Sequence, residues 1–285
     1  MTIKNYLLLT KPTILFFSLS TFFTAFALSS QLNNINWTQF TIILTGCAFL
    51  FAGSACVNQI MENKDDAKMA RTQKRPIPSK NISIKKAIVF SIIWITIGEI
   101  LLIKSTNQTV FILANLTIII YNLIYTPTKK ITWLNTYIGA IAGASPSLCG
   151  WYAHNQIFEI NSLFLFILII IWQLPHFYAI AWCYKEDYKI ANFKMLSEQD
   201  QSGSKTLKHI TFSTIALMIW SLTPLQTKLL NIPYLIGASL SGLLLLYCVM
   251  IFHKERTPKQ AKKLMFQTLI YLLLIISFIF IDILI

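Results

Sequence analysis

The segment Ser162-Leu-Phe-Leu-Phe-Ile-Leu-Ile-Ile-Ile-Trp-Gln-Leu-Pro-His-Phe-Tyr-Ala-Ile-Ala-Trp-Cys183 decides the fold class, because it contains no Asp, Glu, Lys or Arg. A helix needs about 20 apolar residues to cross the roughly 30 Å of hydrocarbon in a bilayer. Eight other segments meet or approach that length. The nine predicted spans cover residues 11–30, 39–58, 87–103, 110–126, 134–153, 162–183, 208–223, 232–252 and 264–285. We therefore expect an all-α integral membrane protein, a bundle of about nine transmembrane helices.

The composition supports this class. Of the 285 residues, 55% are hydrophobic and 12% are charged, whereas soluble domains carry about 25% charged residues. The net charge of +13 is better explained by membrane topology than by nucleic acid, so we expect no nucleic-acid partner. The five cysteines are dispersed without a CxxC spacing, which argues against a zinc site and against a disulfide framework.

The basic residues predict the orientation. If the N-terminus is cytoplasmic, nine spans place 22 of the 24 Lys and Arg residues inside and leave Lys104 and Lys228 outside. Cytoplasmic loops carry such an excess in membrane proteins. We therefore expect one transmembrane domain over residues 1–285, with its C-terminus on the outer side. The lack of an obvious transit peptide favours a bacterial inner (plasma) membrane.

Two inner loops, at about residues 59–86 and 184–207, are longer than the others. They hold seven of the eleven acidic residues: Glu62, Asp65, Asp66, Glu186, Asp187, Glu198 and Asp200. Because these loops follow spans four helices apart, they suggest two pseudo-repeated four-helix units with one acidic loop each. We expect the two loops to form a polar cap over an active site.

The first loop begins with an acidic helix end. If the second span continues as a helix to Asp66, then Asn58, Glu62 and Asp66 fall within an arc of about 80°. Oxygen ligands of this kind suit Mg²⁺, which commonly takes one or two carboxylates and completes its shell with water and phosphates. Basic residues follow at once, at Lys68, Arg71, Lys74 and Arg75. This pattern predicts a diphosphate site, and the alternative is a solvated charged loop.

The sixth span adds two further candidates. Asp187 follows the end of this span, and two acidic helix ends facing one another would hold two metal ions on one diphosphate. His176 lies beside Pro175 within the span. An ionisable residue within the hydrocarbon is a functional candidate by default. The alternative for His176 is a packing role, with its ring hydrogen-bonded to a neighbouring helix.

Four segments together resemble one known family. They are Asn58 to Arg75, Tyr125 to Gly139, Gly143 to Trp151, and Trp172-Gln-Leu-Pro-His-Phe177 with Asp187-Tyr188, and Leu9-Thr-Lys-Pro12 matches the same family's opening. This order of motifs is similar to the UbiA superfamily of intramembrane prenyltransferases. Asn58 and Asp66 occupy the ends of its N-x-x-x-D-x-x-x-D motif, and Glu62 replaces the middle Asp. The Trp172 to Phe177 segment and the thinned second acidic motif are typical of the haem-directed branch.

The resemblance implies an activity and roles for the site residues. It implies transfer of a farnesyl group from farnesyl diphosphate to the 2-vinyl group of protohaem IX (haem b), with addition of water. Glu62 and Asp66, oriented by Asn58, would bind Mg²⁺, and Asp187 a second ion. His176 would contact the haem iron or act as an acid or base. Diphosphate or haem propionates would be bound by Arg71, Arg75, Lys129, Lys130 and Lys185.

Two other functions remain open from the sequence. A UbiA-type enzyme acting on a quinone precursor or another porphyrin would carry the same acidic motif. A transporter with an ion site would place its charged residues at the bilayer midplane, whereas those of this chain cluster at helix ends. For the haem-directed activity, the resemblance implies haem b as a substrate rather than a cofactor, and haem A synthase or a terminal oxidase as protein partners.

Overall fold

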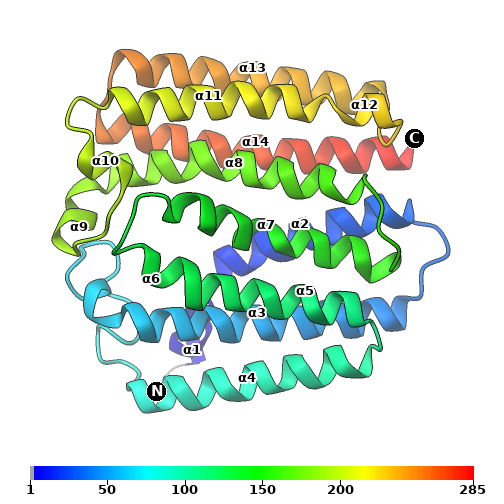
Figure 1. Cartoon of the computed structure of the whole chain (residues 1–285), viewed down its shortest axis with the longest axis horizontal. Coiled ribbons are helices and arrows are strands. Elements are labelled where there is room, and N and C mark those ends of the chain that lie inside the picture. The colour runs from blue at the N-terminus through cyan, green and yellow to red at the C-terminus, as the bar shows by residue number, and fades with distance from the viewer. Residues whose placement is uncertain (1–2) are drawn as a thin grey trace.

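Long helices running side by side make up most of the structure (Figure 1), a computed structural model that describes residues 3–285. The first half contains α1 (Ile3–Leu9), α2 (Pro12–Ser30), α3 (Trp37–Asp66), α4 (Ile84–Lys104), α5 (Gln108–Ile119), the π-helix η1 (Ile120–Tyr125) and α6 (Thr126–Thr128). The second half contains α7 (Asn135–His154), α8 (Ser162–Cys183), α9 (Lys185–Ile190), α10 (Leu196–Gln199), α11 (Ser204–Ser221), α12 (Pro224–Thr227), α13 (Ile232–Lys254) and α14 (Pro258–Leu284). The predicted all-α membrane fold is confirmed.

Each predicted span coincides with a long helix or with the continuous segment from α5 to α6. Seven of these are long and apolar enough to cross a membrane: α2, α3, α4, residues 108–128, α8, α13 and α14. The other two, α7 and α11, are more polar. The first two turns of α11 contain Lys205, Lys208 and His209. The helix α7 is rich in Gly, Ser and Ala. The pseudo-repeat of two four-helix units stays a prediction.

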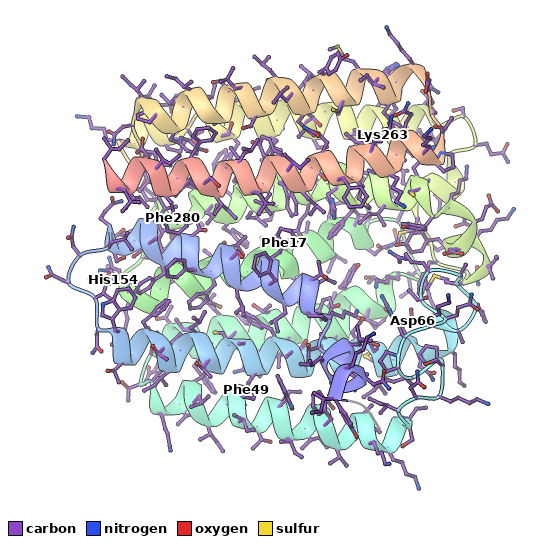
Figure 2. The ribbon with its side chains drawn as sticks, turned by 180° about the vertical axis from the view of Figure 1, so that it is seen from behind. Phe17, Phe49, Asp66, His154, Lys263 and Phe280 are labelled. Atoms are coloured by element: carbon purple, nitrogen blue, oxygen red, sulfur yellow. The ribbon has the colours of Figure 1, made fainter. Side chains whose placement is uncertain are left out.

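The two acidic loops lie at the same end of the bundle (Figure 1). Their bounds are narrower than predicted, because α3 continues to Asp66 and α4 begins at Ile84. The intervening residues 67–83 contact α9 at this loop end, through hydrogen bonds of Ala70 and Arg71 to Asp187. From behind, Asp66 lies at the loop end, whereas His154 and Phe280 lie toward the opposite end (Figure 2).

The π-helix η1 shapes the bundle near the loop end. Pro127 follows it and cannot donate a backbone hydrogen bond, which removes one bond of the ordinary α pattern. The hydroxyl of Thr126 donates instead to the carbonyl of Tyr121, five residues earlier, at 2.8 Å. Single π turns of this kind are frequent at functional sites. This one positions Tyr121 and Tyr125 against the interior, where both line the central cavity.

Glycine permits a close contact between two helices. A Cβ atom built on Gly150 of α7 would lie 1.9 Å from the backbone oxygen of Phe22 in α2. No side chain fits in that space, so α2 and α7 can pack at this distance only around a glycine. This contact fixes two of the helices that line the cavity.

Candidate active site

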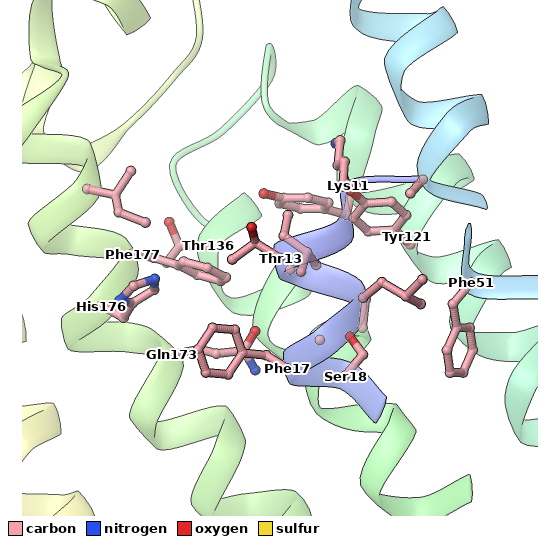
Figure 3. Close-up of a pocket in the computed structure, with 18 of the residues that line it drawn as sticks. Lys11, Thr13, Phe17, Ser18, Phe51, Tyr121, Thr136, Gln173, His176 and Phe177 are labelled. Carbon is pink, nitrogen blue, oxygen red and sulfur yellow. The ribbon is translucent and has the colours of Figure 1, made fainter. Parts of the chain in front are cut away.

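A cavity of about 420 Å³ lies beneath the two loops, between α2, α3, η1, α7, α8 and α14. Its loop end is charged, with Glu62, Asp66, Arg75 and Lys129 in the wall. The deeper wall is mostly apolar and aromatic. Figure 3 shows this part, with Phe17, Phe177 and His176 on one side of α2 and Phe51 on the other. The site therefore joins a charged entrance to an apolar chamber.

The predicted acidic face exists on α3. Asn58, Glu62 and Asp66 are 0%, 5% and 1% exposed, as expected for one buried helical face. Each carboxylate is paired with a base, since Lys129 Nζ lies 2.6 Å from Glu62 and Arg75 Nη1 lies 2.7 Å from Asp66. The second carboxylate oxygen of Asp66 is buried and has no hydrogen-bond partner within the described part of the chain. One anionic ligand position therefore remains free.

Lys129 is held charged by this pairing. Burial lowers the pKa of a lysine, but the nearby Glu62 carboxylate outweighs it and raises the pKa of Lys129 above its usual value. The Lys129 ammonium also lies 4.4 Å from the ring centroid of Tyr125. The prediction that Lys129 belongs to an anion site is consistent with its place in the cavity wall.

Both polar atoms of the Asn58 side-chain amide form hydrogen bonds. Its nitrogen donates to the Thr126 hydroxyl at 2.7 Å, and its oxygen accepts a hydrogen bond from Lys11. Lys11 also donates to the hydroxyl of Tyr121 at 3.2 Å. Asn58 therefore ties α3 to η1 and to the start of α2.

Lys11 is a site residue that the sequence reasoning missed. It caps the N-terminus of α2 in a left-handed conformation, with φ of 50°, and its side chain lies in the cavity wall. Burial, and then the nearby Arg75, lowers the pKa of Lys11 to about 7. The available signal was the Leu9 to Pro12 motif, which indicated the family without indicating that the lysine faces the site.

The predicted basic residues divide into two groups. Arg71 lines the cavity beside Arg75 and Lys129, and its guanidinium donates to the hydroxyl of Tyr188 at 3.0 Å. Lys130 instead pairs with Asp65 at 2.7 Å, and its side chain is 54% exposed. Lys185 donates to the backbone oxygen of Asp200 at 3.2 Å. Neither Lys130 nor Lys185 is among the residues that line the cavity.

Asp187 does not join the acidic face of α3. Its two carboxylate oxygens accept hydrogen bonds from the backbone amides of Ala70 and Arg71, each at 3.1 Å. Within residues 3–285, no group of three or more His, Cys, Asp or Glu side chains is placed to hold a metal ion. Both oxygens of Asp187 thus hold the loop that contains Arg71, and the role of Asp187 in binding a second metal ion stays a prediction.

His176 lies in the cavity wall on α8. Its ring stacks on that of Trp172, with centroids 5.2 Å apart and an interplanar angle of 15°. Its Nδ1 lies 2.8 Å from the hydroxyl oxygen of Thr268 in α14. His176 thus has the hydrogen bond to a neighbouring helix that a packing residue would have, and it also reaches the cavity.

The donor set fits one magnesium ion. Glu62 and Asp66 offer two carboxylates at the charged entrance, and the free oxygen of Asp66 is available. Mg²⁺ is commonly bound through one or two carboxylates together with substrate phosphates and water. A third protein carboxylate is not required for such a site.

Comparison with known proteins bears on the fold and the family. A solved structure of digeranylgeranylglyceryl phosphate synthase covers 99% of this chain with a TM-score of 0.80 and 21% identity. A UbiA homologue from Archaeoglobus fulgidus, solved with GPP and Mg²⁺, covers 99% with a TM-score of 0.60 and 14% identity. At these identities the likeness shows the fold.

Sequence similarity is stronger. The protoheme IX farnesyltransferase of Solibacter usitatus is 33% identical over 287 residues, covering 98% of this chain and 98% of that protein. The UbiA prenyltransferase family profile matches residues 18–274. The chain therefore belongs to the UbiA prenyltransferase family, on its protohaem IX farnesyltransferase branch.

Proposed function

We propose that this enzyme transfers the farnesyl group of farnesyl diphosphate to the 2-vinyl group of haem b, with addition of water, to give haem O and diphosphate. The supporting observation is a charged entrance, formed by Glu62, Asp66, Arg71, Arg75 and Lys129, above an apolar cavity. Such a site suits a substrate with a diphosphate head and an isoprenoid tail. The full-length similarity to a protoheme IX farnesyltransferase favours haem b as the acceptor.

Glu62 and Asp66 would hold Mg²⁺ at the entrance. The ion would neutralise charge that builds on the departing diphosphate. Arg71, Arg75 and Lys129 lie in the same wall and would bind the phosphate oxygens. Preorganised groups of this kind are worth roughly 10²- to 10³-fold in rate per donor.

The apolar chamber would protect the reaction from water. When the bond between C1 of the farnesyl group and the diphosphate oxygen breaks, the allylic cation faces the aromatic rings of Phe17, Tyr121 and Phe177. The terminal vinyl carbon then bonds to C1, and water adds to the carbon next to the porphyrin with loss of a proton. Early entry of water would give farnesol instead, so a mostly apolar wall favours prenyl transfer.

The orientation and partners follow from the same proposal. The excess of Lys and Arg at the loop end supports a cytoplasmic N-terminus and a site that faces the cytoplasm. The lipid bilayer of a bacterial inner membrane would supply both hydrophobic substrates. Haem A synthase or a terminal oxidase would receive the product.

The test is expression of the chain in bacterial membranes that lack haem O synthase, followed by mass analysis of extracted haems and quinone precursors. The proposal predicts haem O. Recovery of a prenylated aromatic acid without haem O would contradict it and would assign a quinone precursor as the acceptor.

A further inference from the structure

We propose that Thr268 is a positioning residue that fixes which nitrogen of His176 carries hydrogen, so that His176 offers an unprotonated Nε2 to the haem iron. This inference rests on the proposed function, because it takes haem b as the substrate. It concerns a contact between α14 and α8 that has no counterpart in the acidic motif. Three hydrogen bonds at Thr268 carry the inference.

The first bond, to Met265, determines the direction of the second, to His176. A threonine hydroxyl has one hydrogen, and that of Thr268 is donated to the backbone oxygen of Met265 at 2.6 Å. With its hydrogen placed there, the same oxygen accepts from His176 Nδ1, which lies 2.8 Å away. We assign the hydrogen in that bond to Nδ1 on this hydrogen-bond geometry. A neutral imidazole carries one N–H group, so its Nε2 is left with a free lone pair.

The surroundings keep the imidazole neutral. Within residues 3–285, His176 forms no ion pair with an Asp or Glu side chain. Its chain neighbours Pro175 and Phe177 are apolar, Trp172 covers one face of the ring, and the threonine at its Nδ1 is uncharged. A buried imidazolium without a carboxylate partner would be costly.

The third bond holds the ring in place. Thr268 is fully buried, and its backbone oxygen accepts a hydrogen bond from Trp172 Nε1 at 2.6 Å. The same residue thus bonds His176 through its hydroxyl and the stacked Trp172 through its carbonyl. Thr268 on α14 therefore orients the rings of both Trp172 and His176 on α8.

This arrangement suits a haem ligand. Histidines that ligate metals commonly donate their other ring N–H to an oxygen, which fixes the tautomer and the ring orientation. Imidazole is a common axial ligand of haem iron. His176 lies beside Thr136 and Phe177 at the wall of the cavity (Figure 3), so iron ligation would anchor the porphyrin inside the chamber that receives the farnesyl group.

The test compares Thr268→Val with Thr268→Ser by titrating haem b into the purified proteins and recording absorption spectra. Valine has the shape of threonine without the acceptor oxygen, whereas serine keeps it. We expect Thr268→Val to weaken haem binding roughly 10- to 100-fold, the range found for such supporting partners, and to give the spectrum of His176→Ala. Thr268→Ser should restore the wild-type spectrum.

A matched control is Thr214→Val. Thr214 is also fully buried, but it lies on α11 and does not line the cavity, so its loss should leave the haem spectrum unchanged. A wild-type spectrum and affinity in Thr268→Val would overturn the inference, and so would an unchanged spectrum in His176→Ala. Haem O production by the wild type, measured in parallel, tests the proposed function separately.

Discussion

Asp65 and Asp66 are adjacent carboxylates with different surroundings. Asp66 lines the cavity and pairs with Arg75, whereas Asp65 pairs with Lys130 and lies outside the cavity wall. We expect Asp66→Asn to lower haem O formation roughly 100- to 1,000-fold, because it removes an anionic magnesium ligand. The matched variant Asp65→Asn should stay within a few-fold of the wild type. Equal activity of the two variants, measured in membranes with equal protein content, would remove Asp66 from the metal site.

The lowered pKa of Lys11 predicts that anion binding depends on pH. Burial lowers the pKa of Lys11 to about 7, and a bound diphosphate would raise that pKa by favouring the charged form. Below pH 7, Lys11 is therefore already charged before the anion binds. Above pH 7, Lys11 must take up a proton when the anion binds. At pH 6 we expect the wild type to bind magnesium diphosphate about 10-fold more tightly than Lys11→Met. This difference should shrink as the pH rises from 7 to 9.

Calorimetric titration of the two proteins from pH 6 to 9 measures that ratio. Because the titration of diphosphate itself affects both proteins equally, the ratio isolates Lys11. Lys4→Met is a suitable control, since Lys4 is exposed and precedes the site. A ratio that does not change with pH would show that Lys11 keeps its charge throughout.

The site residues on α3 could be predicted, because a spacing of four residues defines one helical face. Lys11 and Tyr121 could not, because they reach the cavity through a left-handed residue and a π turn that local sequence does not specify. The contacts of Asp187 could not be predicted for a related reason. A sequence places an acid at a helix end but does not tell whether its oxygens face a metal ion or backbone amides.

At the scale of elements, Asp187 joins the two loops that cover the cavity. Its carboxylate accepts hydrogen bonds from the backbone amides of Ala70 and Arg71. The variant Asp187→Ala should therefore speed hydrogen exchange at these two amides about 10-fold. It should also weaken diphosphate binding, because Arg71 lies in the cavity wall. The neighbouring Glu186 is exposed, and Glu186→Ala is the control. Equal exchange rates in the two variants would contradict this role.

The contact of α2 with α7 makes a prediction about stability. Alanine at position 150 would place its Cβ 1.9 Å from the backbone oxygen of Phe22, and the helices must separate to relieve the clash. We expect Gly150→Ala to cost at least about 1–3 kcal/mol, the usual cost of overpacking. Gly242→Ala should cost less, since its Cβ would meet the flexible side chain of Met218 at 2.9 Å. Thermal unfolding in detergent compares them, and equal Tm values would refute the argument.

The helices themselves were largely predictable, because apolar length identifies a span. Hydropathy alone locates their ends less well. The predicted second span ended at residue 58, where the apolar run stops, and only the spacing of Asn58, Glu62 and Asp66 indicated that the helix could continue. The helix α3 does continue for two further turns to Asp66, where its buried face is polar. Hydropathy also understates α7, whose small and polar residues face neighbouring helices and the cavity instead of lipid.

At the scale of the whole molecule, the charge distribution and the cavity agree. The predicted spans place 22 of the 24 Lys and Arg residues on one side, and the charged wall of the cavity lies at that same loop end (Figure 2). The sequence could predict this because topology depends on charge counts rather than on fine packing. The cavity volume and the tautomer of His176 depend on contacts between distant helices, and no single sequence displays those.

The most direct measurement uses the purified protein in liposomes with farnesyl diphosphate, haem b and Mg²⁺. We predict one haem O and one diphosphate for each haem b consumed, and loss of both products when EDTA removes the metal. Haem b that stays unmodified with Mg²⁺ present, or product formation that continues undiminished in EDTA, would contradict the proposed magnesium-dependent farnesyl transfer.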